Sequence, residues 1–461
     1  MEGMAEAVRT LIILGATGDL TSRLLLPALG QLLTREPQRR LELVGVGTSD
    51  WTTAHWRSVV RKSFATVKAS GDSVDDLLSS TRFTSADVTK PDALKELLGA
   101  AEGTPALYFA LPPAVTKDVC AALAQIELPE DLRLALEKPF GTDKRSAAAL
   151  NRRLTALVPE DHVHRIDHFL GNSTVQNLFG LRFANRIFEP LWSTEHVERV
   201  DIVFDEQLGL EGRAGYYDHA GALVDMIQSH LLQVMAVVAM EPPSTMSAAD
   251  LRDAKELVLR ATKVWDDDAV AASHRGRYTS GTIDGRTLPD YVDEQGVDPA
   301  QGTETLAQVT FAVGNWRWSG VPFTLRSGKA IGTLRHEIVL TFRQAHHVPT
   351  GLRGVAHPSQ LRIKLGPDEM VLEVNTNGPG NPRYLSRSEL HADFGPGSLL
   401  AYGEVLAGVL DGDPALSVRG DTAEECWRIV APVLKAWRDG DVPLDDYAAG
   451  SEGPADWSVI P

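Results

Sequence analysis

The stretch Arg165-Ile166-Asp167-His168-Phe169-Leu170-Gly171 divides the chain into two patterns. Before it, short apolar runs alternate with helical segments, an order that is typical of a parallel sheet covered by helices. Beyond it, a long helical stretch is followed by strand-like runs in series, which predict an α+β domain with a large, mainly antiparallel sheet. We therefore expect two domains, 1–167 and 168–461, with Asp167 and His168 lining a cleft between them.

A glycine-rich turn follows the first apolar run. We expect Thr10–Leu14 to form a buried strand that leads into Gly15-Ala16-Thr17-Gly18-Asp19-Leu20 and then a leucine-rich helix extending to Leu32. Glycines allow the backbone to approach a dinucleotide pyrophosphate, to which a helix N-terminus offers N–H groups and a positive dipole. The sequence thus predicts a dinucleotide site, with an ordinary tight turn as the alternative.

The second predicted strand, 41–46, ends where domains of this kind bind the adenosine ribose. Thr48 and Asp50 follow it, and the chain has no lysine or arginine between Arg40 and Arg57. A carboxylate at this position accepts a hydrogen bond from a ribose 2′-hydroxyl, whereas an arginine accommodates a 2′-phosphate. Asp50 therefore favours an unphosphorylated ribose, unless it is only a solvated loop residue.

Three further predicted strands, 106–110, 132–136 and 163–166, should end at the same edge of the parallel sheet. Lys138 follows the second of them and stands beside Pro139, which restricts the backbone. We expect the Lys138 side chain to face the crevice at that edge, with an exposed surface lysine as the alternative.

A second histidine, His230, lies on a helix predicted to extend to residue 238. It shares one stripe of this helix with three apolar residues, a spacing that on its own indicates a core histidine (Leu223, Ile227, Val234). Asp225 precedes His230 by five residues, which at ~3.6 residues per turn places the two about 140° apart around the helix. We therefore expect Asp225 and His230 to flank a cleft without stacking.

The composition is that of a soluble globular protein. The 461 residues carry a net charge of -17, which argues against nucleic-acid partners and acidic membrane surfaces, since both require a basic patch. Cys120 and Cys426 lack the spacing of metal ligands, so we expect no metal site and two reduced thiols. No apolar run approaches the ~18 residues of a membrane span, and the start does not resemble a secretory signal. We expect a cytoplasmic protein.

The stretches described above and several others form a series of motifs along the chain. In order, these motifs are the 15–20 turn, Glu137-Lys138-Pro139-Phe140-Gly141, the 165–171 stretch, the 215–233 segment, Thr303-Glu304-Thr305, Asn315-Trp316-Arg317-Trp318, the 322–329 segment, Cys426-Trp427-Arg428-Ile429 and Gly450-Ser451. In this order they resemble the glucose-6-phosphate 1-dehydrogenase family, and the similarity covers nearly the whole chain.

The resemblance implies a Rossmann domain and a β+α domain that forms a homodimer through its large sheet. It also implies a function in carbohydrate metabolism: oxidation of glucose 6-phosphate at C1 to the δ-lactone, with hydride transfer to NAD or NADP. By position, His230 is the implied general base and Asp167 the residue that holds its ring, a task that suits an imidazole. The implied substrate-binding residues are Lys138, His168, Glu206, Asp225, Lys329 and Arg335, and the implied cofactor-binding residues are Gly15, Thr17, Gly18, Asp19, Leu20, Thr48, Asp50 and Lys138.

Departures from the family pattern affect both ligands. On the phosphate side, Asn172 and Leu334 stand where the family usually has cations, although Arg335 follows one place later. Each lost charge-assisted hydrogen bond is worth about 1.5–3 kcal/mol, which keeps open an alternative substrate, an unphosphorylated or differently substituted aldose. On the cofactor side, Thr48 and Leu24 replace an arginine and a lysine, which favours NAD or dual use. The intact acid and base argue against a non-catalytic sugar or nucleotide sensor.

Overall fold

The computed structural model describes residues 7–457 except 213, 367 and 396, and it contains two compact units. The first unit comprises the chain up to Asn172 together with Pro243–Ala254 and Ser398–Glu425, and the second unit comprises Ser173–Pro242, Lys255–Gly397 and the chain from Cys426. Both units are therefore discontinuous in sequence, whereas the sequence pattern predicts two continuous domains. The boundary between residues 167 and 168 stays a prediction.

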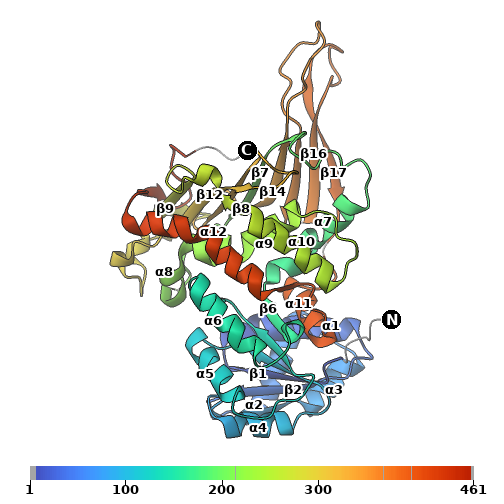
Figure 1. Cartoon of the computed structure of the whole chain (residues 1–461), viewed down its shortest axis with the longest axis vertical. Coiled ribbons are helices and arrows are strands. Elements are labelled where there is room, and N and C mark those ends of the chain that lie inside the picture. Colours follow the sequence, from blue (N-terminus) through green and yellow to red (C-terminus); the bar gives the residue numbers. More distant parts are fainter. Residues whose placement is uncertain (1–6, 213, 367, 396, 458–461) are drawn as a thin grey trace. The chain divides into compact units, whose positions relative to one another are not determined.

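The first unit is built on a seven-stranded sheet in the order β18-β6-β5-β4-β1-β2-β3, parallel throughout except for β18 (Figure 1). This is the predicted Rossmann-like arrangement. Its strands are β1 (Thr10–Leu14), β2 (Glu42–Gly47), β3 (Arg82–Ser85), β4 (Pro105–Phe109), β5 (Arg133–Leu136), β6 (Val163–Ile166) and β18 (Ser417–Val418).

Helices cover both faces of this sheet, and the strands β1, β4 and β5 are accordingly buried along their whole length. Side chains of α1 (Leu26–Arg35), α2 (Thr53–Thr66), α3 (Asp72–Ser80) and α11 (Ala401–Asp411) form the core on one face. The opposite face packs against α4 (Pro91–Gly99), α5 (Pro113–Leu123) and α6 (Lys144–Thr155). The unit also contains the π-helix η1 (Thr21–Leu25) and the short 3-10 helices η2 (Glu160–His162) and η3 (His168–Gly171).

The second unit is built on a ten-stranded, mainly antiparallel sheet, as predicted (Figure 1). Its path is β17-β16-β15-β14-β7-β13-β12-β9-β19, with β8 paired to β12, and only the pairs β7–β13 and β9–β19 are parallel. The strands are β7 (Val197–Asp205), β8 (Thr262–Val264), β9 (Ser273–Thr279), β12 (Leu306–Val313), β13 (Pro322–Gly328), β14 (Arg335–Phe342), β15 (Gln360–Leu365), β16 (Asp368–Thr376), β17 (Ser386–Asp393) and β19 (Leu444–Ala448). A separate hairpin pairs β10 (Gly281–Ile283) with β11 (Arg286–Leu288).

The central helical stretch of this unit is α8 (Ala214–Ala222), the π-helix η4 (Leu223–Leu231) and α9 (Leu232–Ala239), and η4 packs on β12 and β13. In the described part of the chain it is the single stretch, Ala214–Ala239, that is long and apolar enough to cross a membrane. Its most apolar window is 83% buried inside the protein, as expected of a core helix. The second unit also contains α7 (Ser173–Phe183) and the short η5 (Trp265–Asp267), η6 (Tyr291–Asp293) and η7 (Pro299–Gln301). Two helices, α10 (Ala248–Ala261) and α12 (Gly420–Asp439), begin in the first unit and end in the second.

Helix α7 ends at Phe183, within the stretch from residue 175 to about residue 192 whose sequence looks first helical and then aromatic. The Asn185 amide donates to the carbonyl oxygens of Gly180 and Leu181, which satisfies the last turn of α7. Turns then occupy 186–196, and Pro190 lacks the N–H that a continuing helix would use.

Candidate active site

The predicted pyrophosphate turn is a tight turn that begins at Gly15. Gly15 has φ +84°, and a Cβ atom on it would lie 2.2 Å from the carbonyl oxygen of Ala110, so only glycine fits. The N–H groups of Gly15 and Ala16 both donate to Val46, which ties the turn to the end of β2. Helical residues begin at Asp19, directly after Gly18, and the turn therefore presents a glycine backbone and a helix start to an anion.

Two of the predicted cofactor-binding residues, Thr48 and Asp50, lie directly after β2. Thr48 and Asp50 are both exposed directly after β2, and Leu24 is exposed on η1. The Arg57 guanidinium donates to the carbonyl oxygens of Ser79 and Thr81 at 2.9 and 3.3 Å, so it is held elsewhere. Among the described residues directly after β2, Thr48 to Asp50, the one charged side chain is therefore the carboxylate of Asp50.

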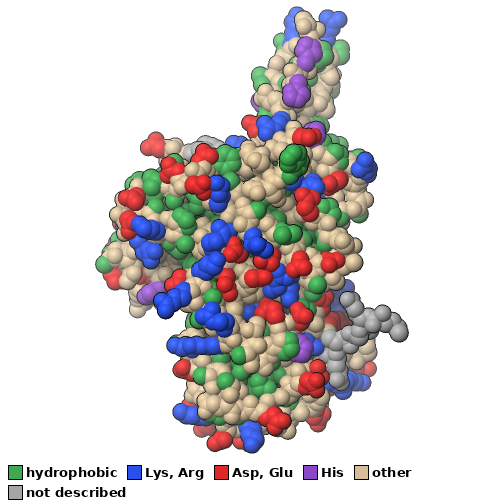
Figure 2. Space-filling view, in the orientation of Figure 1, with side chains coloured by type: hydrophobic (Ala, Val, Ile, Leu, Met, Phe, Trp, Pro, Cys, Tyr) green, Lys and Arg blue, Asp and Glu red, His purple; other side chains and the backbone are tan. Residues whose placement is uncertain are grey.

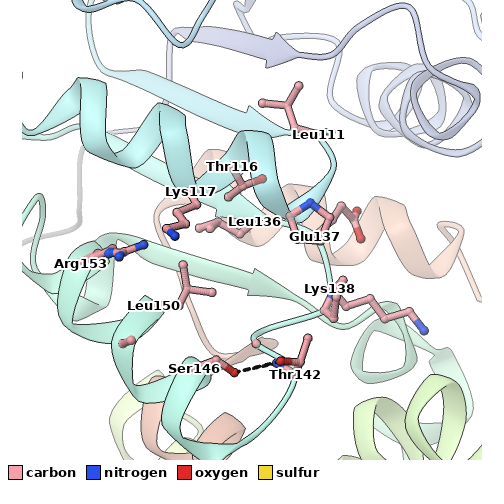
Figure 3. A pocket seen from close by; sticks show the side chains of 14 residues that line it. Leu111, Thr116, Lys117, Leu136, Glu137, Lys138, Thr142, Ser146, Leu150 and Arg153 are labelled. Atoms are coloured by element: carbon pink, nitrogen blue, oxygen red, sulfur yellow. Dashed lines mark hydrogen bonds between the residues drawn. The ribbon is translucent and has the colours of Figure 1, made fainter. Parts of the chain in front are cut away.

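Lys138 stands in the loop after β5, preceded by Glu137 and joined to Pro139 by a cis peptide bond. A pocket of about 270 Å³ lies beside this loop, between α5 and α6. Figure 3 shows Lys117 and Arg153 at one side of the pocket, while the Lys138 side chain extends away from both. The loop therefore presents the Lys138 amino group on the side opposite to these two cations.

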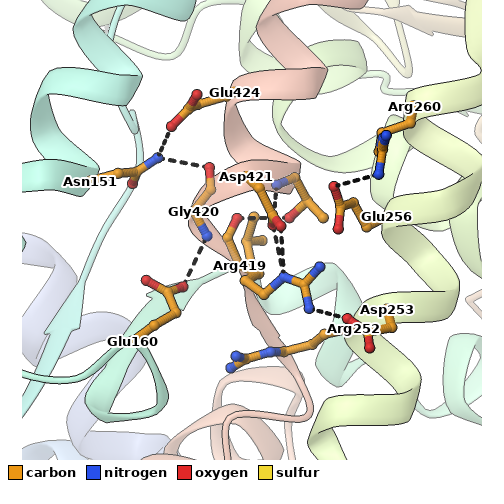
Figure 4. Close-up of polar contacts among 12 residues, drawn as sticks. Asn151, Glu160, Arg252, Asp253, Glu256, Arg260, Arg419, Gly420, Asp421 and Glu424 are labelled. Carbon is orange, nitrogen blue, oxygen red and sulfur yellow. Dashed lines mark hydrogen bonds and ion pairs between the residues drawn. The ribbon is translucent and has the colours of Figure 1, made fainter. Parts of the chain in front are cut away.

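Strand β6 delivers Asp167 and His168, and a buried arginine fixes this strand. Arg165 donates to the Asn151 side-chain oxygen at 3.0 Å and to Glu160 at 2.7 Å. Gly420 in turn donates its N–H to Glu160 and accepts from Asn151 (Figure 4). Charge-assisted bonds of this kind are roughly twice as strong as neutral ones, so the strand before Asp167 is held firmly.

Asp167 is buried and forms the N-cap of η3, where its carboxylate accepts the Phe169 N–H at 3.0 Å. His168 stacks on Tyr402 of α11, with ring centroids 5.0 Å apart and planes 11° apart. Tyr402 lies far from His168 in sequence, and the ring contact fixes the plane of the imidazole.

Glu137 lies at the centre of a buried hydrogen-bond cluster. Tyr108, at the adjacent strand β4, donates its hydroxyl to Glu137 at 2.5 Å, and Tyr402 also hydrogen-bonds to this carboxyl group. Burial raises the pKa of Glu137 to about 7, and the nearby Asp167 carboxylate adds to this effect, although Tyr108 and Lys138 oppose it. Glu137 belongs to the motif at residues 137–141, but neither tyrosine partner is predictable from the sequence.

In the second unit, the two parallel strands β7 and β13 end side by side and bring Glu206 and Lys329 together. The Lys329 ammonium group donates to Glu206 at 2.7 Å and lies 5.1 Å from the centre of the Tyr217 ring. Arg335 begins β14 at the same end of the sheet, in register with Asp205. Its guanidinium donates to Glu337 at 2.7 and 3.0 Å, so part of its donor capacity is used within its own strand.

Asp225 and His230 lie closer together around their helix than predicted. The expected separation of about 140° assumes ~3.6 residues per turn, but η4 (Leu223–Leu231) is a π-helix. At its end the Leu232 N–H donates to the Ile227 carbonyl five residues earlier. The hydrogen bonds of a π-helix join residues that are five apart, about one turn along the helix. Asp225 and His230 therefore lie on one side of η4. His230 is 1% exposed, and Tyr216 donates its hydroxyl to Asp225.

Together, the glycine turn, the parallel sheet and the acid and basic residues at its edge define an oxidoreductase that uses a nicotinamide dinucleotide. Family models agree over both parts of the chain. Residues 12–177 match the glucose-6-phosphate dehydrogenase NAD binding domain, and residues 179–460 match the glucose-6-phosphate dehydrogenase C-terminal domain. The chain belongs to the glucose-6-phosphate dehydrogenase family.

Full-length relatives support this assignment. The chain is 36% identical to glucose-6-phosphate 1-dehydrogenase of Zymomonas mobilis and 37% identical to that of Mycolicibacterium smegmatis, covering 98% and 97% of this chain and 97% and 95% of those proteins. The solved Mycobacterium avium enzyme is 33% identical with a TM-score of 0.85 over 97% of this chain and 95% of that one. A glucose-6-phosphate dehydrogenase in complex with glucose 6-phosphate is 29% identical with a TM-score of 0.89 over 99% and 97%.

Replacement of Glu137 should change how stability depends on pH. Since the folded-state pKa is raised from 4.5 to about 7, the buried carboxyl favours folding when protonated, and this contribution is lost as pH rises through 7. The shift corresponds to about 3 kcal/mol at ~1.4 kcal/mol per pKa unit. From pH 5 to pH 8, wild type should therefore lose up to that amount of unfolding free energy relative to Glu137→Gln, measured by urea denaturation.

The control is Glu127→Gln, which removes an exposed carboxylate of the same unit. Its unfolding free energy is measured over the same pH range and gives the background against which Glu137→Gln is judged. Parallel curves for wild type and Glu137→Gln would show that Glu137 does not titrate as a buried group.

Proposed function

We propose that this protein oxidises glucose 6-phosphate at C1 to 6-phosphoglucono-δ-lactone and transfers the hydride to NAD(P)⁺. The observation that carries this proposal is the likeness, over 99% of the chain, to a glucose-6-phosphate dehydrogenase in complex with glucose 6-phosphate. Relatives with the same name and similar length extend this support. The alternative substrate, an unphosphorylated or differently substituted aldose, is not favoured by these relatives.

In this reaction we assign the proton transfer to His230. An imidazole accepts a hydroxyl proton readily near neutral pH, and the carboxylate of Asp167 would orient the ring and stabilise its protonated form. The hydroxyl of C1 loses its proton to the base as the hydride leaves that carbon. When bound, the nicotinamide ring accepts the hydride.

The remaining predicted residues bind the two ligands in this proposal. Lys138, Glu206, Asp225 and Lys329 would hold sugar hydroxyls, and the Glu206–Lys329 ion pair supports this because it pre-orients a donor and an acceptor at one sheet edge. His168 and Arg335 would bind the 6-phosphate. The 15–20 turn, with Gly15, Thr17, Gly18, Asp19 and Leu20, would bind the pyrophosphate, Lys138 would also contact the cofactor, and Thr48 and Asp50 would lie at the adenosine ribose.

Removal of the base should abolish turnover while leaving binding nearly unchanged. His230→Asn keeps a polar side chain of similar length but cannot accept the C1 proton, so we expect kcat with glucose 6-phosphate to fall by at least about 10²-fold. Steady-state kinetics and dinucleotide titration would measure both effects. A His230→Asn enzyme with most of its turnover would show that another group is the base.

Free glucose serves as a second substrate for the wild-type enzyme. Higher wild-type activity on glucose than on glucose 6-phosphate would favour the alternative substrate.

We also propose that the enzyme prefers NAD⁺ or uses both dinucleotides. Asp50 would repel a 2′-phosphate, and neither Thr48 nor Leu24 supplies a positive charge to pair with it. The ratio of kcat/KM for NAD⁺ to that for NADP⁺ should therefore be at least one, and Thr48→Arg should lower it about tenfold, since one charge-assisted hydrogen bond exceeds 1.4 kcal/mol. A wild-type enzyme with roughly tenfold higher kcat/KM for NADP⁺ would contradict this proposal.

A homodimer in the cytoplasm completes the proposal. Figure 2 shows acidic and basic side chains interspersed on the face drawn, which gives no support for a nucleic-acid partner. Among the described strands, β17 pairs only with β16, so its other edge is open. The Leu390 side chain on β17 is 56% exposed. Open edges and exposed apolar side chains favour association. Light scattering should give twice the 50.0 kDa chain mass, and a monomer at micromolar concentration would contradict the dimer.

A further inference from the structure

The Thr303-Glu304-Thr305 motif has no role in the proposed mechanism, yet all three residues are buried directly before β12. Strand β12 is antiparallel to β13, and Leu306 pairs with Gly328. The motif therefore lies at the end of the sheet where Lys329 follows β13 and Glu206 follows β7.

The helix that carries Asp225 and His230 begins against Glu304. At Gly221 the chain has φ +65°, which interrupts the preceding helix, and the helix restarts at Ala222. The first N–H groups of a helix have no partner within it. Here the Ala222 N–H donates to the Glu304 carbonyl oxygen at 3.2 Å, and the Leu223 N–H donates to the Glu304 carboxylate at 2.9 Å.

Gly221 allows this close contact. A Cβ atom on Gly221 would lie 2.3 Å from one carboxylate oxygen of Glu304 and 2.6 Å from its carboxyl carbon. The carboxylate therefore fills the space where any other residue would place its side chain. Glu304 thus performs the task of an N-cap residue from outside the helix, in the segment that precedes β12.

The two threonines connect the same motif to the lysine side of the site. The Lys329 N–H donates to the Thr305 carbonyl oxygen at 2.8 Å. The Thr305 hydroxyl lies 2.8 Å from the Tyr447 hydroxyl, which donates to the Lys329 carbonyl oxygen at 2.7 Å. Thr303 donates its hydroxyl to the Asp218 carbonyl oxygen at 2.5 Å, in the helix before Gly221. One three-residue segment thus holds the backbone at the start of η4 and at Lys329.

We propose that Glu304 is a positioning residue for catalysis: its carboxylate sets the start of η4 and thereby the place of His230 relative to the sugar-binding residues Glu206 and Lys329. The inference rests on the proposed function, in which His230 is the base. It concerns the position of a hydrogen-bond acceptor, and a neutral acceptor at the same place should serve as well as a carboxylate.

Two substitutions separate acceptor position from charge. Glu304→Asp keeps the charge but withdraws the acceptor by one methylene from the Leu223 N–H, and kcat with glucose 6-phosphate should fall by about tenfold or more, because small displacements of a catalytic group are costly. Glu304→Gln keeps an oxygen acceptor at full length, so its kcat should stay within about threefold of wild type. Dinucleotide affinity should be unchanged in both, since the predicted dinucleotide site is in the first unit.

The matched control is Tyr291→Phe, which removes a neighbouring buried hydrogen bond of 2.7 Å to Asp218 without touching the start of η4. It should lower the melting temperature but leave kcat within about twofold of wild type. A Glu304→Asp enzyme with wild-type kcat, a Glu304→Gln enzyme as impaired as Glu304→Asp, or a Tyr291→Phe enzyme that loses as much kcat would each overturn the inference. Wild-type turnover of glucose 6-phosphate is measured alongside, and its absence would refute the proposed function instead.

Discussion

Parallel strands that end together place the predicted reactive residues in both units. In the first unit, β4, β5 and β6 are neighbours, and the residues that follow the last two are Glu137, Lys138, Asp167 and His168. The second sheet is mostly antiparallel, yet its parallel pair β7–β13 carries the Glu206–Lys329 ion pair at its end. Carboxyl ends of parallel strands meet at one edge, so side chains distant in sequence converge there without any long loop.

Burial of two carboxyl groups accompanies this convergence. Glu137 and Glu304 both lie in low-dielectric surroundings that raise the pKa of each to about 7, with burial as the main cause. An unpaired buried carboxylate would be strongly unfavourable. Hydrogen bonds offset the cost of burying each of these two carboxyl groups: Tyr108 and Tyr402 donate to Glu137, and the Leu223 N–H donates to Glu304. These bonds hold chain segments far apart in sequence next to the predicted site residues, which makes the buried acids useful as structural links.

Local patterns made part of this arrangement predictable. The strand at Thr10–Leu14, the glycine turn and the alternation before residue 167 specify the first sheet, because glycine conformation and strand periodicity are local properties. Lys138 and Lys329 are predictable from their places after strands. The contacts of Tyr402 with His168 and of Glu304 with Leu223 are not, since they join segments more than 80 residues apart. The end of α7 at Phe183 is not predictable from apolar periodicity either, because the Asn185 side chain bonds to the carbonyl oxygens of its last turn.

The π-helical turns are not predictable from apolar periodicity either, and η4 determines the relative directions of Asp225 and His230. An α-helix would place Asp225 and His230 on different sides, whereas η4 places them on one side, because its hydrogen bonds span five residues. A second π-helix, η1, follows the 15–20 turn directly, and the Leu26 N–H donates to Thr21 five residues earlier. π-helical turns are rare and are often found at functional sites. Only η4 starts close to a glycine with positive φ, because Gly221 lies two residues before Leu223, whereas η1 starts six residues after Gly15. The interruption at Gly221, followed by the wider turns of η4, thus sets the directions of Asp225 and His230.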